Sequence, residues 1–168
     1  MRKIKLDKID IQILKDLQQD GRMTNVELAE RAEISAPPCL RRVRALEEAG
    51  FLKGYHAEIN AEMLGFGIVV FAQVGLIKQA ESDLRAFESL VQSWPFVREC
   101  YMLAGETDFI LKIVAPDWDA YQKFLSSQLT PAPNVTHVKS SLCLRVSKKE
   151  PGIPMEMVAA DFYEATKE

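Results

Sequence analysis

Long uncharged apolar runs are missing from this chain. No stretch of about 18 such residues occurs in its 168 positions, so the sequence offers no transmembrane helix. The N-terminal run MRKIKLDKID reaches its first acidic residues before any apolar stretch, so no secretory signal peptide is expected. These absences favour a cytoplasmic protein without a membrane partner.

Cysteine and histidine are scarce. The three cysteines are Cys39, Cys100 and Cys143, no CxxC pair occurs, and there are two histidines. The scarcity argues against a disulfide framework and a zinc site, and the thiols are expected to pack as small apolar side chains. No nucleophile, base or metal cluster converges in the sequence, so we expect neither a cofactor nor an enzyme.

A strong positive charge is also missing, because the net charge is −3. Residues 1–60 carry 11 Lys and Arg against 10 Asp and Glu, and residues 61–168 carry 10 against 14. The overall balance therefore gives no electrostatic footprint of nucleic-acid binding. DNA binding would depend on the local placement of cations and on dimers or larger assemblies that add phosphate contacts.

The chain does have a helix-turn-helix pattern before residue 54. Apolar residues at three- and four-residue spacing predict a helix over 7–19, closed by Asp20-Gly21. Thr24 and Glu27 form a capping-box pattern for a second helix. Ser35, followed by prolines, is the expected N-cap of a third helix that ends before Gly50.

The third helix carries three arginines within four residues. At about 100° per residue, Arg41, Arg42 and Arg44 share one arc with Pro38 and Ala45. The opposite, packing arc is expected to hold Cys39, Leu40, Val43 and Leu46. One side can therefore pack while the other faces phosphate, the layout of a DNA-reading helix.

Seven residues are candidate DNA contacts. They are Thr24, Asn25, Ser35, Pro38, Arg41, Arg42 and Arg44. Two alternatives stay open: Thr24 and Ser35 can be plain helix caps, and the arginines can form a solvated face paired with Glu47 and Glu48.

The second part of the chain repeats the order strand, helix, strand. Apolar runs predict strands over 68–76, 97–103, 109–115 and 135–146, and helices over 80–94 and 117–129. The order βαββαβ is that of a ferredoxin-like fold, with one sheet face left bare to find an oligomeric partner. A loose alternation over 51–60 predicts a linking strand, and the glycines within 62–67 predict a hinge.

Two segments of the chain resemble the leucine-responsive/AsnC family of bacterial transcription regulators. One begins at Leu6 and includes the string PCLRRVRALEEAGFLKGY, and the other is AGETDFILKIVAPDWDAYQKFL. The resemblance spans about residues 6–147. It implies a helix-turn-helix joined by a strand to a ferredoxin-like ligand-sensing domain, in dimers that assemble further, often to octamers, and respond to amino acids.

One position departs from the family pattern. The run is Ser35-Ala36-Pro37-Pro38-Cys39, whereas the family usually has a hydroxyl residue where Pro37 stands. Proline has neither a side-chain donor nor an N–H, so a hydrogen bond that relatives donate to DNA from this position is not expected in this chain.

The resemblance also implies an amino-acid site at the GETDF turn, in a cleft between dimers. Glycine lets a ligand approach the backbone, free N–H groups can take its carboxylate, and Asp108 can take its ammonium. The candidate residues are Tyr101, Met102, Gly105, Glu106, Thr107, Asp108, Ser140 and Ser141. Core packing competes for the strand residues, and a plain hairpin turn is the alternative for Gly105 to Asp108.

These inferences predict an α+β protein in four parts. A three-helix, winged-type helix-turn-helix DNA-binding domain (1–52) precedes a linker strand and hinge (53–65). A ferredoxin-like βαββαβ domain for effector binding and oligomerisation (66–147) precedes a tail (148–168). In the tail, Met155, Val158, Phe162 and Ala165 suggest a short helix that packs on its own subunit or on a neighbour.

The predicted function is sequence-specific regulation of transcription. A dimer would present two recognition helices to a pseudo-palindromic duplex, and an amino acid would favour one assembly state over another. The alternative is an architectural protein that wraps DNA without sensing an effector.

Overall fold

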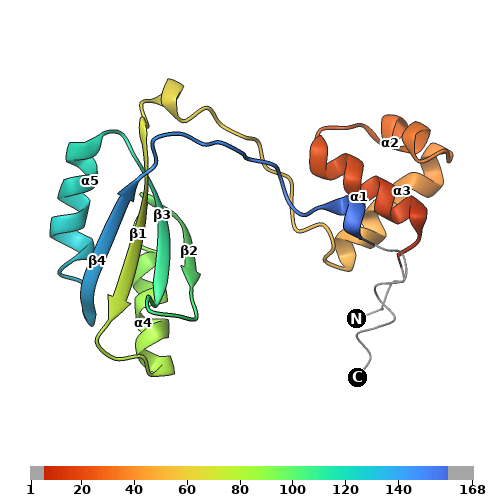
Figure 1. Cartoon of the computed structure of the whole chain (residues 1–168). Coiled ribbons are helices and arrows are strands. Elements are labelled where there is room, and N and C mark those ends of the chain that lie inside the picture. Colours follow the sequence, from red (N-terminus) through yellow and green to blue (C-terminus); the bar gives the residue numbers. More distant parts are fainter. Residues whose placement is uncertain (1–5, 159–168) are drawn as a thin grey trace. The chain divides into compact units, whose positions relative to one another are not determined.

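The computed structural model describes residues 6–158 in two compact units (Figure 1). The helix-turn-helix unit comprises residues 6–58 together with 148–158, and the sheet unit comprises residues 59–147. Residues from both ends of the described chain therefore build the first unit.

The helix-turn-helix unit has three helices, close to the predicted ranges. They are α1 (Lys8–Gln19), α2 (Asn25–Arg31) and α3 (Ala36–Glu48). Asp7 and Asp10 form a capping box at the start of α1, and Thr24 and Glu27 form the predicted one at α2. Gly50 takes a φ of 81° just after α3, as expected of a residue that ends a helix in the left-handed conformation.

The core of this unit is formed by the inward faces of its helices. Its buried apolar residues are Leu6, Ile13, Leu17, Leu28, Ala29, Ala32, Cys39 and Leu46. Burial raises the pKa of the Cys39 thiol, which therefore packs as a neutral apolar group, as predicted.

The segment after α3 differs from the prediction. No strand forms over residues 51–60 in the described part of the chain. Phe51 and Leu52 donate their N–H groups back to the Leu46 carbonyl, and no strand among residues 6–158 pairs with residues 53–60. A strand is defined by its pairing, so alternation in one segment predicts an exposed face but does not supply the neighbour. The predicted hinge contains one turn of 3₁₀ helix, Glu62–Leu64.

The sheet unit has the predicted βαββαβ order. Its elements are β1 (Ile68–Leu76), α4 (Glu81–Val91), β2 (Val97–Met102), β3 (Phe109–Ala115), α5 (Trp118–Phe124) and β4 (Val135–Leu142). All strand pairs are antiparallel, in the order β2-β3-β1-β4 (Figure 1). This is a ferredoxin-like sheet with β1 and β3 at its centre.

The ends of α5 and β4 show why observed ranges agree with the predicted ones or differ from them. Asp117 caps α5 by accepting the Ala120 N–H at 2.7 Å, and a π-helical turn, Leu125–Leu129, extends this helix to its predicted end. β4 ends at Leu142 rather than at 146, because its ladder with β1 runs only to the pair Val70 and Leu142.

Both helices of the sheet unit pack on one face of the sheet. Phe87 of α4 and Tyr121 and Phe124 of α5 join the same buried cluster as Phe109 of β3 and Val70 of β1. The other face includes Phe71, which is exposed. One face of the sheet is thus uncovered within the described chain, as the sequence predicted.

The C-terminal tail folds back on α1. The Gln18 side chain donates to the Ile153 carbonyl at 2.7 Å and accepts the Ile153 N–H at 3.0 Å. Gly152 has a φ of 66°, a left-handed conformation that favours glycine, and a Cβ there would displace the Gln18 side chain, whose Oε1 would lie 2.1 Å away. Met155 is buried, whereas Phe162 and Ala165 lie outside the described residues. The observed helical part is a single 3₁₀ turn, Met155–Met157, on its own chain.

Met155 anchors the tail, and its removal gives a testable result. Met155 is 6% exposed, whereas Met157, two residues later, is 79% exposed. We expect Met155→Ala to destabilise the helix-turn-helix unit by about 2 kcal/mol, because it removes buried apolar surface and leaves a cavity. Hydrogen exchange of the α1 amides measures this loss. Met157→Ala is the matched control, and equal effects of the two variants would show that the tail adds no stability.

Candidate nucleic-acid interface and ligand site

The exposed side of α3 differs from the predicted arc. Its exposed residues recur at three- and four-residue spacing and form what we call the outward stripe. They are Pro37, Leu40, Arg41, Arg44, Glu47 and Glu48. Leu40, expected on the packing arc, belongs to this stripe, whereas Cys39 and Leu46 are buried as predicted.

Arg42 turns away from the outward stripe. Its Nη1 lies 2.7 Å from the Asp10 Oδ1 and 2.8 Å from the Asp7 Oδ2, and its side chain is half-buried. The expectation that all three arginines face solvent is therefore wrong for Arg42. The three side chains span an arc of about 160°, and Arg42 lies at the edge of that arc nearest α1.

The contacts around Arg42 favour the charged forms of both partners. The hydrogen bond with Asp10 raises the pKa of the Arg42 guanidinium. Partial burial acts to raise the pKa of Asp7, but the Asp10 N–H and Arg42 outweigh it and hold that pKa below its usual value. These ionised groups hold α3 against the start of α1.

A second buried acid of α1 holds α2. Asp16 is 3% exposed, accepts from the Gln12 side chain at 3.0 Å and pairs with the Arg31 Nη1 at 3.2 Å. Asp10 and Asp16 thus each bind an arginine from a different helix. The positions of the two helices of the helix-turn-helix relative to α1 therefore depend on paired charges as well as on the apolar core.

The remaining predicted DNA residues lie around the turn between α2 and α3. The Thr24 hydroxyl is engaged in its capping box, and the Asn25 amide donates to the Ala36 carbonyl at 2.8 Å. Ser35 is the N-cap of α3, but its side chain makes no capping hydrogen bond and is exposed. Pro38 is half-buried. Plain capping by the Ser35 hydroxyl, one of the alternatives from the sequence, is therefore not observed.

Charge is divided along the outward stripe. Arg41 and Arg44 form no ion pair within residues 6–158, so the alternative from the sequence, pairing with Glu47 and Glu48, is not observed there. Glu47 instead accepts from the Tyr55 hydroxyl at 2.9 Å, and burial together with Glu47 raises the pKa of Tyr55 to about 12. Arg41 and Arg44 thus precede the acids Glu47 and Glu48 along α3. In helix-turn-helix proteins the N-terminal residues of the recognition helix contact the base edges.

The GETDF turn joins β2 to β3 and is held by Asp108. The Leu103 N–H donates to the Asp108 carbonyl at 2.8 Å, and the Leu76 N–H donates to the Asp108 Oδ2 at 2.6 Å. Gly105 has a φ of 157°, no described residue beyond its chain neighbours lies within 4 Å of where a Cβ would be, and Glu106 is exposed. Asp108 is thus a structural anchor of the turn whose Oδ1 makes no hydrogen bond to any described residue.

The strand residues predicted to line the same pocket point in different directions. Ser140 pairs with Ala72 on the helix-covered face and hydrogen-bonds to the Tyr121 hydroxyl, whereas Ser141 pairs with the exposed Phe71. Successive residues of a strand point to opposite faces. One pocket on either face therefore cannot take both serines, which corrects the joint prediction.

The same alternation separates Tyr101 from Met102. Their partners on β3 are Ile110, which is half-buried, and Phe109, which is buried. The Tyr101 hydroxyl donates to Glu99 at 2.9 Å, and both Tyr101 and Met102 are exposed. Of the predicted strand residues, Tyr101 and Ser141 belong to the bare face of the sheet.

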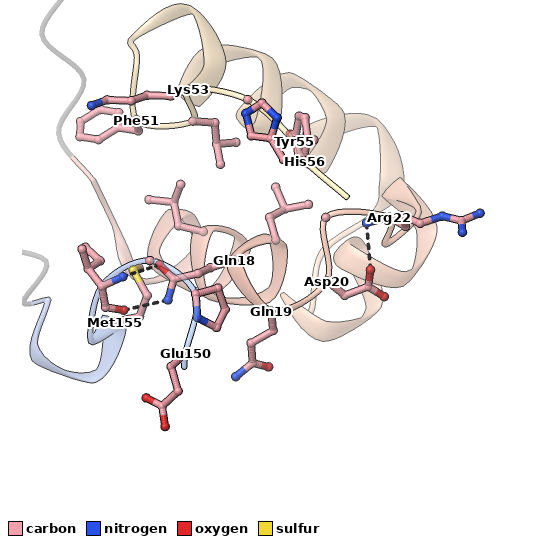
Figure 2. A pocket seen from close by; sticks show the side chains of 18 of the residues that line it. Gln18, Gln19, Asp20, Arg22, Phe51, Lys53, Tyr55, His56, Glu150 and Met155 are labelled. Carbon is pink, nitrogen blue, oxygen red and sulfur yellow. Dashed lines mark hydrogen bonds between the residues drawn. The ribbon is translucent and has the colours of Figure 1, made fainter. Parts of the chain in front are cut away.

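A cavity that the sequence did not predict lies within the helix-turn-helix unit (Figure 2). It has a volume of about 1200 Å³ between α1, the segment 51–58 and the tail 149–158. Leu14 and Leu17 contribute apolar surface. Gln18 connects α1 to the tail (Figure 2). No pattern in the sequence could indicate it, because residues that line it, such as Gln18 and Ile153, are 135 positions apart in the chain.

Two family models match the chain in separate ranges. Residues 6–53 match a winged helix-turn-helix DNA-binding model, and residues 69–153 match the Lrp/AsnC ligand binding domain. The leucine-responsive regulatory protein of Rhizobium meliloti (strain 1021) is 51% identical over 146 residues, which cover 87% of this chain and 94% of that protein. The chain belongs to the Lrp/AsnC family.

Solved structures of this family have the same fold. A transcriptional regulator from Neisseria meningitidis, solved as a complex with L-Met, has a TM-score of 0.84 and 39% identity, and the match covers 89% of this chain and 97% of that one. An AsnC family regulator from Agrobacterium tumefaciens has a TM-score of 0.84 and 27% identity, with 91% and 100% covered.

This Lrp/AsnC protein is a DNA-binding transcription regulator with a ligand-binding domain. Its fold is α+β, as predicted, and the ligand-binding domain favours a regulator over a purely architectural protein. No helix in the described part of the chain could cross a membrane. Within residues 6–158, no three His, Cys, Asp or Glu side chains lie together as metal ligands would.

Proposed function

We propose that this Lrp/AsnC regulator binds duplex DNA through the part of the outward stripe that precedes Glu47. The observation that carries the proposal is the exposure of Arg41 and Arg44 without an ion-pair partner in the described chain. Both guanidinium groups are free to neutralise phosphates or to donate to guanine. The exposed Ser35 hydroxyl at the start of α3 is the third contact, where the helix dipole favours an anion.

The other predicted DNA residues have positioning roles in this proposal. Arg42 fixes α3 to α1, and Asn25 fixes the turn between α2 and α3. Thr24 begins α2 and Pro38 lies beside the Arg42 contact, so both shape the surface around the stripe. DNA affinity would then depend on Arg42 through the placement of α3.

For the effector, we propose an amino acid bound at the GETDF turn. The solved regulator from Neisseria meningitidis, which has the same fold, is a complex with L-Met. At the turn, exposed backbone around Gly105 can take a carboxylate, and the Asp108 Oδ1 can accept from an ammonium group. Glu106, Thr107 and Tyr101 remain candidates for contacts to the ligand side chain. Ser140 and Met102 belong to the other side of their strands, and Ser141 pairs with Phe71, five positions along β1 from the Leu76 that binds Asp108.

The proposed mechanism acts through assembly in the cytoplasm. The bare sheet face, with Phe71 exposed on it, would join two copies, and dimers would assemble further, up to octamers. A dimer would place two α3 helices on half-sites about one helical turn of DNA apart, or a multiple of it. The effector works by binding one assembly state more tightly than the other, because only differential affinity shifts such an equilibrium.

The effector proposal is tested with Asp108→Asn. Asparagine keeps an oxygen that can accept from the Leu76 N–H, but it removes the charge that would attract an ammonium group. A thermal-shift screen of the twenty amino acids first finds the ligand of the unmodified protein. We expect the variant to bind that ligand about 10- to 100-fold more weakly while binding DNA without ligand as before.

The control is Asp119→Asn, which neutralises an exposed acid of α5 whose carboxylate pairs with no described residue. It should leave ligand affinity unchanged. Unchanged ligand affinity in Asp108→Asn would place the amino-acid site elsewhere.

A further inference from the structure

One apolar side chain lies among the charges of the outward stripe. Leu40 is 39% exposed, whereas Cys39 and Leu46 on the other side of α3 are 0% and 1% exposed. Val43 is half-buried and packs against the buried cluster of the helix-turn-helix unit, whereas Leu40 is among the exposed apolar residues. Leu40 therefore contributes little to the core, and its role depends on what meets α3 from outside.

The neighbours of Leu40 identify what it faces. Pro37 lies one turn before it, Arg41 follows it and Arg44 lies one turn after it, all within an arc of about 100°. A small apolar surface made by Pro37 and Leu40 is thus bordered by two cations without ion-pair partners in the described chain. An apolar protein partner would desolvate both guanidinium groups, whereas DNA would pair them with phosphate.

The major groove presents one apolar group to such a surface. Each base edge there carries hydrogen-bonding groups, and thymine adds a C5-methyl group. An aliphatic side chain without donors or acceptors can discriminate between bases only through that methyl or through shape. The position of Leu40 near the middle of α3, between Ser35 and Glu48, brings it to the groove if the N-terminal half of α3 enters it.

We propose that Leu40, with Pro37 beside it, is a specificity-determining residue that packs against a thymine C5-methyl group in the major groove. The proposal rests on the DNA-binding function proposed above, and it adds which base the helix recognises and by which group. Arg41 and Arg44 supply affinity through phosphates or guanine, and Leu40 supplies preference for thymine at one position of each half-site.

The test removes the methyl group from the DNA and the side chain from the protein. The full chain first selects its preferred duplex from a randomised pool, and each thymine of that duplex is then replaced by uracil, which lacks only the C5-methyl. We expect one thymine per half-site at which uracil weakens binding about fourfold, the value of one buried methyl-sized group. Leu40→Ala should bind the thymine and uracil duplexes equally at that position.

Arg44→Ala is the control for this cycle. It should weaken binding to both duplexes by the same factor and keep the fourfold difference between them. Thermal unfolding of Leu40→Ala should match that of the unmodified chain, because the residue lies outside the buried cluster.

Three results would overturn the proposal. A fourfold difference that persists in Leu40→Ala would assign the methyl contact to another residue. Selected duplexes without any uracil-sensitive thymine, or a changed oligomeric state of Leu40→Ala with unchanged base preference, would show that Leu40 faces something else. Failure of the unmodified chain to bind any duplex would instead refute the DNA-binding function itself.

Discussion

Replacing Arg41 and Arg44 together by Ala is expected to lower the affinity for duplex DNA about 100-fold at moderate salt, at about tenfold for each lost contact. Both side chains are exposed, and neither has an ion-pair partner in the described chain. Each neutralised phosphate contributes about 0.9 to the slope of log K against log salt. If each arginine neutralises one phosphate, the double variant should have a slope shallower by about 1.8 for each subunit bound to DNA. Fluorescence anisotropy over a salt series measures both quantities.

The control for this variant is Lys78→Ala with Lys123→Ala. It removes the same charge from exposed positions of the sheet unit and leaves α3 intact. The control should change the slope little. An unchanged slope in the double variant of α3 would remove Arg41 and Arg44 from the interface and refute the proposed role of the outward stripe.

Replacing Asp10 by Ala is expected to destabilise the helix-turn-helix unit by about 3 kcal/mol, the effect of breaking a buried ion pair. Asp10 is 5% exposed, contacts Arg42 at 2.7 Å and accepts the Asp7 N–H at 3.0 Å in the capping box of α1. Its loss leaves the half-buried Arg42 with Asp7 as its remaining acidic partner. It also removes one of the two hydrogen bonds of the capping box at the start of α1. Urea unfolding measures the loss.

The control is Glu30→Ala on α2, whose carboxylate is exposed and pairs with no side chain in the described part of the chain. It should change the free energy of unfolding by less than about 0.5 kcal/mol. The folded fraction of Asp10→Ala should keep the salt slope of the unmodified chain, since Arg41 and Arg44 are untouched. A steeper slope would instead indicate that Arg42, once released from Asp10, neutralises a phosphate directly.

The tail, residues 148–158, packs on the helix-turn-helix unit and helps to stabilise it. Lys149 pairs with Glu58 at 2.5 Å, and Lys15 pairs with Glu156 at 3.4 Å, in addition to the Gln18 contacts. These surface pairs contribute little by themselves. Burial of Met155 contributes more, so the tail stabilises the DNA-binding unit mainly by covering apolar surface.

Local patterns in the sequence were sufficient to predict the helices and strands. The capping box at Thr24 and the left-handed Gly50 follow from contacts within a few residues, and the ranges of β1 and β3 were predicted as observed. These features depend on hydrogen bonds and periodicity that each segment carries with it. The βαββαβ order followed from the same segments.

Which side chains of α3 are exposed depended more strongly on packing between helices than on the local sequence. Arg42 and Arg41 are neighbours in the sequence, yet one contacts acids of α1 and the other faces solvent. Leu40 is exposed because α1 and α2 cover a different side of α3 from the one that the helical wheel suggested. The periodicity gives the angles between side chains, but the neighbouring helices determine which angle is buried.

The sequence by itself determined the element types, their order, the caps and the family to which the chain belongs. Only the tertiary structure decided that Arg42 is bound to α1, that Ser140 and Ser141 lie on opposite faces, and that the tail packs on α1. The reason is range: caps and turns form between residues three or four apart, whereas these contacts join residues between 19 and 135 positions apart. Such contacts depend on how whole elements pack, which no local pattern specifies.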